Sequence, residues 1–217
     1  MNLEQARFNM VEQQIRPWDV LDLDILDLLS RLKREDFVPE SAKVLAFVDM
    51  EIPLGNGQKM WQPKMEARVV QDLTIKPTDT ILEIGTGSGY LAALLAKRGR
   101  QVYSVEIDPA LSAQAAKRLQ AAGIDNVLLE VGDAAQGWPN KGPYDVIVLT
   151  GSVPVLPEAI KQQLTIGGRL FAIIGDAPVM RGTLITRVAA NTFSSTVLFD
   201  TVVAPLINAE QPQRFKF

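Results

Sequence analysis

The residues with the clearest chemical meaning form a glycine-rich turn, Glu83-Ile84-Gly85-Thr86-Gly87-Ser88-Gly89. Because glycine has no Cβ, Gly85, Gly87 and Gly89 let the backbone turn tightly and approach a ligand closely. The dinucleotide-binding fingerprint would need its third glycine at position 90, where this chain has Tyr90. The turn therefore disfavours a nicotinamide dinucleotide and favours another ligand, bound by the glycines and by Thr86 between them.

Acidic residues stand at or near the ends of three predicted strands. Glu83 precedes the glycine turn, where its carboxylate would attract a cationic amino or sulfonium group and repel a pyrophosphate. Glu106 ends the second strand, where a carboxylate can accept hydrogen bonds from both hydroxyls of a ribose. Asp133 follows the third strand and could accept one from an adenine amino group. Ile107 and Ala134 are their chain neighbours, and we expect both to line the same site.

Alternating strands and helices must hold these residues together. We predict strands at residues 80–84, 101–106, 126–131, 144–150 and 168–174, and helices at residues 88–97, 109–122 and 155–164. This alternation is typical of a doubly wound, mostly parallel, Rossmann-like α/β sheet, whose ligand lies beyond the carboxyl ends of the strands. We therefore expect the glycine turn and the three acids to share one crevice.

The flanking parts extend this core on both sides. Apolar residues at helical spacing predict helices at residues 3–15 and 21–29, and Pro63 suits the first turn of another helix. Residues 37–62 between them form a loop long enough to suggest function. Residues 183–189 and 196–203 predict an antiparallel hairpin on one sheet edge. We expect one domain over residues 1–217: a helical and loop extension (1–76), a nucleotide-binding core (77–175) and carboxyl-terminal strands (176–217).

Composition excludes several function classes. The chain is 47% hydrophobic and 22% charged, as in an ordinary globular protein, and its net charge of −3 gives no basic field that would attract nucleic acid. It has no cysteine and no histidine, which excludes disulfides, thiolate nucleophiles, Ser-His-Asp triads and the zinc sites built on these ligands, so we expect no metal. The first 17 residues carry dispersed charges and no apolar run, which predicts neither a signal peptide nor a membrane span. We expect a cytoplasmic protein without a membrane partner.

Five blocks follow one another in a specific order and spacing: Met10-Val11-Glu12-Gln13-Gln14-Ile15, Phe37-Val38-Pro39, Pro53-Leu54-Gly55-Asn56-Gly57-Gln58, Leu82-Glu83-Ile84-Gly85-Thr86-Gly87-Ser88-Gly89-Tyr90 and Gly167-Gly168-Arg169-Leu170. Together they resemble the protein-L-isoaspartate O-methyltransferase family of class I methyltransferases. The resemblance covers residues 10–175. It implies S-adenosyl-L-methionine as the cofactor and methyl transfer to an isoaspartyl carboxylate of a damaged protein or peptide, or to a related small-molecule acceptor.

One segment departs from the family that the chain resembles. Where that family has Thr-Ile-Ser-Gln-Pro, this chain has Lys59-Met60-Trp61-Gln62-Pro63, so Trp61 takes the position of the active-site serine and Lys59 that of the threonine. The resemblance implies that Lys59, Met60, Trp61 and Gln62 line the substrate pocket. The indole of Trp61 could fill that pocket, stack on the cofactor, or simply fill the core of a loop.

Loss of the serine does not by itself abolish methyl transfer. An acceptor carboxylate with a pKa of roughly 4 is already ionised at neutral pH, so its attack on an activated methyl group needs no general base. Positioning is then the main contribution to catalysis, and a displacement of about 1 Å can cost on the order of a hundredfold in rate. The sequence assigns no catalytic residue.

Three hypotheses remain open at this point. The first is a methyltransferase of the isoaspartyl type. The second is a homologue that binds S-adenosylmethionine but has lost isoaspartyl activity or uses another acceptor, as Trp61 and Lys59 suggest. The third is an NAD-binding oxidoreductase, against which Tyr90 argues.

Overall fold

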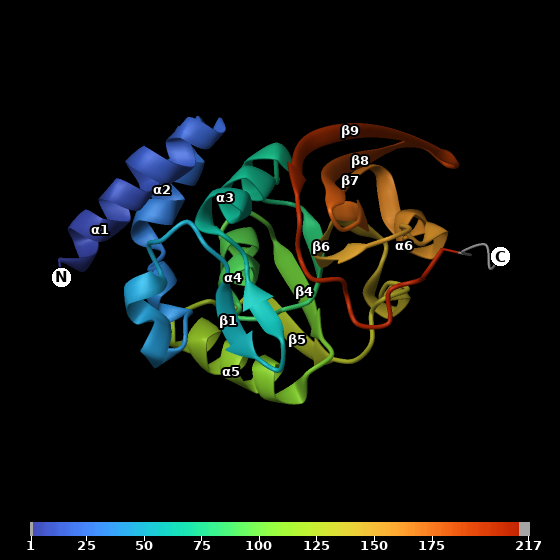
Figure 1. Cartoon of the computed structure of the whole chain (residues 1–217). Helices are drawn as coiled ribbons and strands as arrows, with labels where there is room; N and C mark the ends of the chain where they lie inside the picture. Colours follow the sequence, from blue (N-terminus) through green and yellow to red (C-terminus); the bar gives the residue numbers. More distant parts are fainter. Residues whose placement is uncertain (1, 213–217) are drawn as a thin grey trace.

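The computed structural model describes residues 2–212 and has a seven-stranded sheet at its centre (Figure 1). The strand order is β5-β4-β3-β6-β7-β8-β9, with parallel pairs from β5 to β7 and antiparallel pairs from β7 to β9. The bounds are β3 Thr80–Ile84, β4 Gln101–Glu106, β5 Val127–Val131, β6 Tyr144–Val153, β7 Leu164–Asp176, β8 Val179–Ala189 and β9 Thr192–Thr201. A separate two-stranded hairpin consists of β1 Ile52–Gly55 and β2 Gln58–Met60.

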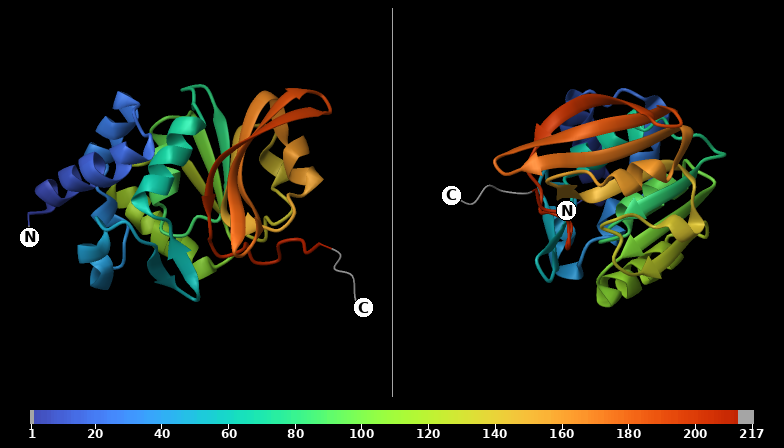
Figure 2. Two further views of the ribbon diagram at one scale, coloured as in Figure 1. Left: turned by 45° about the horizontal axis from the view of Figure 1, so that its top comes forward. Right: turned by 90° about the vertical axis from the view of Figure 1, so that its right-hand side faces the viewer.

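Helices cover both faces of the parallel part of the sheet. The α-helices are α1 Leu3–Met10, α2 Leu23–Arg31, α3 Pro63–Asp72, α4 Tyr90–Ala96, α5 Pro109–Ala121 and α6 Glu158–Gln162. Short helical turns of other types occupy Val11–Ile15, Arg16–Trp18, Arg34–Asp36, Glu40–Leu45 and Pro139–Lys141. Helices α1 to α5 share one buried apolar cluster with one face of the sheet, and α6 shares a second cluster with the other face. Figure 2 shows the amino-terminal helices and the β8-β9 hairpin at opposite ends of the molecule.

The centre of the sheet explains why the glycine turn is where it is. All five residues of β3 are buried, as expected for a strand covered on both faces, and the strand pairs in parallel with β4 and β6. Its carboxyl end therefore opens directly into the turn, between the ends of its two neighbours. Buried residues from Met10 to Val203 contribute to the larger cluster, and on this basis we propose that the described residues form one domain.

The predicted fold class is confirmed, with differences in detail. Strands β3 and β4 have the predicted bounds, whereas β6 and β7 are longer than predicted, so that α6 is shorter than the predicted helix at residues 155–164. The predicted carboxyl-terminal hairpin is present as β8 and β9 and pairs with the sheet through β7. The predicted loop at residues 37–62 was wrong in part, because it contains a 3-10 turn and the β1-β2 hairpin.

Residues 202–212 follow β9 and pass the carboxyl end of the sheet. The amide of Ser152 donates to the Ala204 carbonyl at 3.0 Å, and the amide of Leu206 donates to the Ser152 carbonyl at 2.9 Å. These bonds attach the segment to β6. Within residues 2–212, none of the helices has the length and apolar character needed to cross a bilayer.

Candidate functional site

A cavity lies beyond the carboxyl ends of β3, β4, β5 and β6. Its wall combines the glycine turn, the segments after β4 and β5, the β1-β2 hairpin with the start of α3, and the carboxyl-terminal segment at residues 203–207. Among the predicted cofactor residues, the wall includes Glu83, Gly85, Thr86, Gly87, Glu106, Ile107, Asp133 and Ala134. The structure thus brings these residues together at the sheet edge where the strand pattern placed them.

Glycine is needed at positions 85, 87 and 89 for different structural reasons. Gly85 and Gly87 have φ values of 95° and 53°, in the region that favours glycine, and a Cβ on Gly85 would lie 2.1 Å from Thr150 Oγ1. Gly89 does not line the cavity in the described structure, contrary to expectation. A Cβ there would lie 3.2 Å from the Cβ of Ala115, so Gly89 instead allows α4 to pack closely on α5.

Glu106 fixes the shape of the turn. Its side chain is almost completely buried, Oε2 accepts a hydrogen bond from the Gly87 amide at 2.8 Å, and Oε1 accepts one from the Asp108 amide at 3.0 Å. Each carboxylate oxygen has two lone pairs, so both can still accept a hydrogen bond from a ligand in the cavity. Glu106 therefore combines a structural contact with free acceptor capacity.

Glu83 is the most perturbed acid of the site. It is fully buried, and Oε2 accepts a hydrogen bond from Ser104 Oγ, which also hydrogen-bonds Thr86 Oγ1 at 2.6 Å. Oε1 has no hydrogen-bond partner among the described residues. Burial is the largest cause that raises the pKa of Glu83, to about 8. Without a ligand the group is therefore mostly protonated at neutral pH, and a cationic ligand group beside Oε1 would lower this pKa and favour the carboxylate.

The buried state of Glu83 predicts a stability that depends on pH. Its pKa is about 8 in the folded chain and about 4.5 when unfolded, so its contribution is fully present below pH 4.5 and is lost as the pH rises through 8. The melting temperature of Glu83→Gln minus that of the wild type, both without cofactor, should therefore increase between pH 5 and pH 9. We expect this increase to be on the order of 10 °C. Thermal denaturation of both proteins across this range measures the difference. A constant difference at every pH would contradict this assignment.

Asp133 lies on the exposed rim of the cavity. Its Oδ1 accepts from the Ala135 amide at 2.9 Å, and its Oδ2 accepts from Asn208 Nδ2 at 2.8 Å. The bond to Asn208 joins the rim to the carboxyl-terminal segment, a contact that nothing in the sequence pattern indicated. Asp133 is therefore oriented by two donors before any ligand binds.

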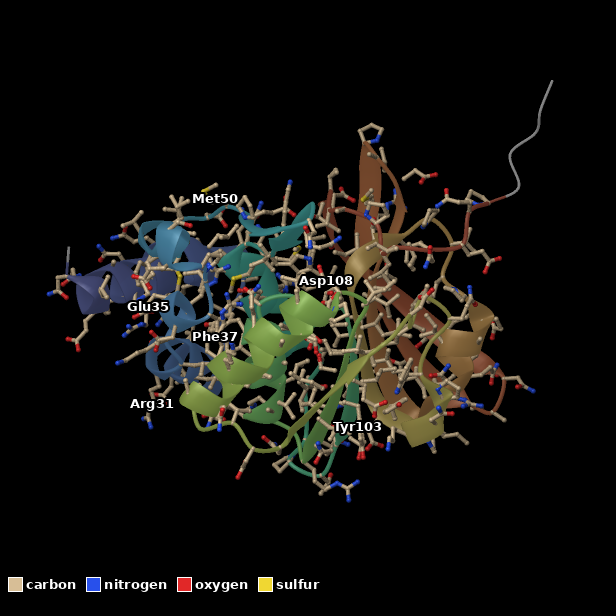
Figure 3. All side chains as sticks on the ribbon, turned by 90° about the horizontal axis from the view of Figure 1, so that it is seen from below. Arg31, Glu35, Phe37, Met50, Tyr103 and Asp108 are labelled. Atoms are coloured by element: carbon tan, nitrogen blue, oxygen red, sulfur yellow. The ribbon has the colours of Figure 1, made fainter. Side chains whose placement is uncertain are left out.

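The β1-β2 hairpin packs beside the glycine turn and encloses the cavity on that side. Leu54 Cδ1 would lie 3.3 Å from a Cβ on Gly87, so the hairpin packs directly against the turn. Asn56 Nδ2 donates to Asp108 Oδ2 at 2.7 Å, and Figure 3 shows Asp108 at the start of α5, beside the hairpin. The hairpin and the turn thus form adjoining walls of the cavity.

Lys59, Met60 and Trp61 continue this wall, but Gln62 does not line the cavity in the described structure. Gln62 instead precedes Pro63 as the first flanking residue of α3, and its backbone has the extended conformation of a helix start. Trp61 is 5% exposed and meets Phe171 edge to face, with ring centroids 6.0 Å apart. Its indole therefore both fills the core beside β7 and borders the cavity.

Comparison with known proteins identifies the family. The family model described as protein-L-isoaspartate(D-aspartate) O-methyltransferase matches residues 6–211. The chain belongs to this family. The match extends beyond the blocks at residues 10–175 and includes the carboxyl-terminal strands and most of the segment that follows them.

Relatives in this methyltransferase family match along nearly the whole chain. Protein-L-isoaspartate O-methyltransferase 2 of Marinobacter nauticus is 37% identical over 210 residues, 96% of each chain. Protein-L-isoaspartate O-methyltransferase 1 of Rhodopseudomonas palustris is 40% identical over 205 residues, 94% of this chain and 84% of that protein. A Plasmodium falciparum protein assigned to the same family, crystallised with S-adenosyl-L-homocysteine, has the same fold, with a TM-score of 0.77, 21% identity and coverage of 95% of this chain and 99% of that one. The family is S-adenosylmethionine-dependent. Membership of it contradicts the hypothesis of an NAD-binding oxidoreductase.

Glu66 is a further acid of the cavity wall and was not predicted from the sequence. It lies on α3, is 2% exposed, lines the cavity, and accepts from Arg34 Nε at 3.0 Å. Burial outweighs the nearby guanidinium of Arg34 and raises the pKa of Glu66 to about 7. A sequence signal existed, because Glu66 is three and four residues before Val69 and Val70 and so lies on the apolar face of the helix.

Arg34 connects three segments beneath this wall. It is fully buried, and besides Glu66 it donates to the Ala46 carbonyl at 2.8 Å and to the Trp61 carbonyl. Its guanidinium lies 5.7 Å from the centroid of the Tyr90 ring. The backbone at Trp61 is therefore fixed by a buried cation whose charge is balanced by Glu66.

Proposed function

We propose that this chain transfers a methyl group from S-adenosyl-L-methionine to an isoaspartyl carboxylate of a protein or peptide. The observation that carries the proposal is one continuous cavity, with the glycine turn and its acids on one side and Lys59, Met60 and Trp61 on the other. A cofactor and an acceptor bound in the same cavity could meet without a change of fold. Family membership supports the reaction class.

The wall residues fit the cofactor. Gly85 and Gly87 permit close approach of the backbone, the unpartnered Oε1 of Glu83 suits an ammonium group, and Glu106 retains acceptor capacity for ribose hydroxyls. Thr86, Ile107, Asp133 and Ala134 would complete the contacts. When bound, the cofactor supplies a methyl group activated by a sulfonium.

The protein's own part in the reaction is positioning. The acceptor carboxylate is ionised at neutral pH, so no residue has to remove a proton from it. The buried pair of Arg34 and Glu66 holds the backbone of Trp61 and so fixes the acceptor wall relative to the glycine turn. We propose no metal in this chemistry.

The assay for this function measures methanol. The protein is incubated with methyl-labelled S-adenosylmethionine and an isoaspartyl peptide, and volatile methanol from the labile ester is counted. We expect turnover with this peptide and none with the same sequence containing ordinary aspartate. Absence of turnover, despite cofactor binding measured by calorimetry, would contradict the proposal.

That negative result would support the second function, a cofactor-binding homologue that has lost isoaspartyl activity or methylates another acceptor. Trp61 and Lys59 favour it, since they replace the family's two hydroxyl side chains. For either function we propose a cytoplasmic protein that acts without nucleic acid or membrane, in keeping with the net charge of −3.

A further inference from the structure

The charges on the cavity wall are strongly unequal. Five acids line it: Glu51, Glu66, Glu83, Glu106 and Asp133. Glu66 is balanced by Arg34, and burial keeps Glu83 mostly protonated at neutral pH without the cofactor. The charge of the wall therefore comes from Glu51, Glu106 and Asp133. Among the described lining residues, Lys59 is the only cation. An acceptor that enters as a carboxylate would meet repulsion from this wall unless a positive charge receives it.

Arg34 cannot serve as that charge. Although it lies close to the acceptor wall, it is fully buried and its donors are already used by Glu66 and by the carbonyls of Ala46 and Trp61. Removing it from these partners would leave Glu66 as a buried, unpaired acid. Arg34 therefore belongs to the support of the wall and not to its surface.

Lys59 has the opposite properties. Its side chain is 48% exposed, its Nζ lies 3.0 Å from Oε2 of Glu51, and the side chain of Glu51 is 21% exposed. An ion pair this open to water is weak, and an ammonium group has three donors on a flexible stem, so Lys59 can turn to another carboxylate at little cost. It stands two residues before Trp61, at the position of a family hydroxyl.

We propose that Lys59 binds the carboxylate of the methyl acceptor, which takes the place of Glu51 as its partner. This inference rests on the proposed function. One carboxylate oxygen stays at the ammonium while the other forms the bond to the methyl carbon, and the carbon–sulfur bond breaks with its electron pair remaining on sulfur. No proton moves. The product is a neutral ester, so Lys59 loses its charged partner and returns to Glu51, which favours product release.

The test compares two lysine–acid pairs that lie near each other in sequence. Lys64 pairs with Asp49 at 2.6 Å, as Lys59 pairs with Glu51, but neither Lys64 nor Asp49 lines the cavity in the described structure. We expect Lys59→Met to raise the KM for the isoaspartyl peptide at least tenfold and Lys59→Arg to raise it much less. Glu51→Gln should lower the KM for the peptide, because the change removes the carboxylate that pairs with Lys59. Lys64→Met should change it less than twofold, and all four variants should bind S-adenosylhomocysteine like the wild type.

Calorimetric titration of the isoaspartyl peptide into the protein saturated with S-adenosylhomocysteine separates this inference from the proposed function. Peptide affinity that is lost in Lys59→Met supports the inference even where the wild type releases no methanol, an outcome that contradicts only the function. The inference about Lys59 would be overturned by equal peptide affinity and equal KM in the wild type and in Lys59→Met. The absence of measurable peptide binding to the wild type would also overturn it.

Discussion

We expect the replacement of Glu106 by leucine to weaken the binding of S-adenosylhomocysteine by about a hundredfold. The variant loses the acceptor capacity that faces the cavity and leaves the Gly87 and Asp108 amides without their carboxylate partner. Hydrogen bonds to a charged group contribute about 1.5–3 kcal/mol each, so a loss of about 3 kcal/mol is expected, which is about a hundredfold in Kd. Isothermal titration calorimetry measures it directly.

A conservative variant and a remote acid control this prediction. Glu106→Gln keeps a carbonyl acceptor without the charge and should fall between the wild type and the leucine variant. Asp125→Asn removes an exposed acid that does not line the cavity, and should leave the affinity unchanged. An affinity of Glu106→Leu within threefold of the wild type would show that Glu106 serves only the turn.

We expect the replacement of Trp61 by serine to lower the stability of the protein and to raise its isoaspartyl methylation. The indole is 5% exposed against Phe171, and truncation of a buried tryptophan to a small residue costs about 3–5 kcal/mol. The same change enlarges the acceptor end of the cavity and returns a hydroxyl group to the wall. Denaturant unfolding measures the stability, and methanol release at saturating cofactor measures the methylation.

Two variants separate these effects of Trp61. Trp61→Phe retains an aromatic ring and no hydroxyl, so it should lose less stability and gain no activity. Trp18→Ser removes a partly buried tryptophan that packs on Phe199 away from the cavity, and should lower stability without raising methylation. If Trp61→Ser binds cofactor normally and methylates no faster than the wild type, position 61 does not limit the reaction.

The core of the fold was predictable because its signals are local. Strands β3 and β4 are short runs rich in β-branched and aromatic residues that end at a glycine turn and at an acid, and their bounds agree with the prediction. Parallel pairing then brings Glu83 and Glu106 to one sheet edge without further information. Gly89 shows the limit of the motif, since spacing alone does not distinguish a glycine that faces a ligand from one that faces a helix.

The rest of the site depends on contacts between distant residues. The hairpin β1-β2 has Asn56-Gly57 at its turn, both with positive φ, which is a hairpin signal, but its strands are too short to show an alternating pattern. Its place on the cavity is fixed by Asp108, 52 residues later in the chain. Glu66 is fixed by Arg34, 32 residues earlier. Sequence patterns over short windows do not contain such pairs.

The carboxyl-terminal segment was the least predictable wall of the site. Residues 202–212 have no helix or strand pattern, and their position depends on Ser152 and on the bond from Asn208 to Asp133. These partners are between about fifty and seventy-five residues away. Only the folded sheet edge brings them together.

The central claim is that cofactor and acceptor share one cavity, and a crystal structure with S-adenosylhomocysteine and an isoaspartyl peptide tests it most directly. We predict the ribose within hydrogen-bond distance of Glu106 and the peptide carboxylate beside Lys59 and Trp61. A peptide bound outside this cavity, or a ribose away from Glu106, would contradict the account.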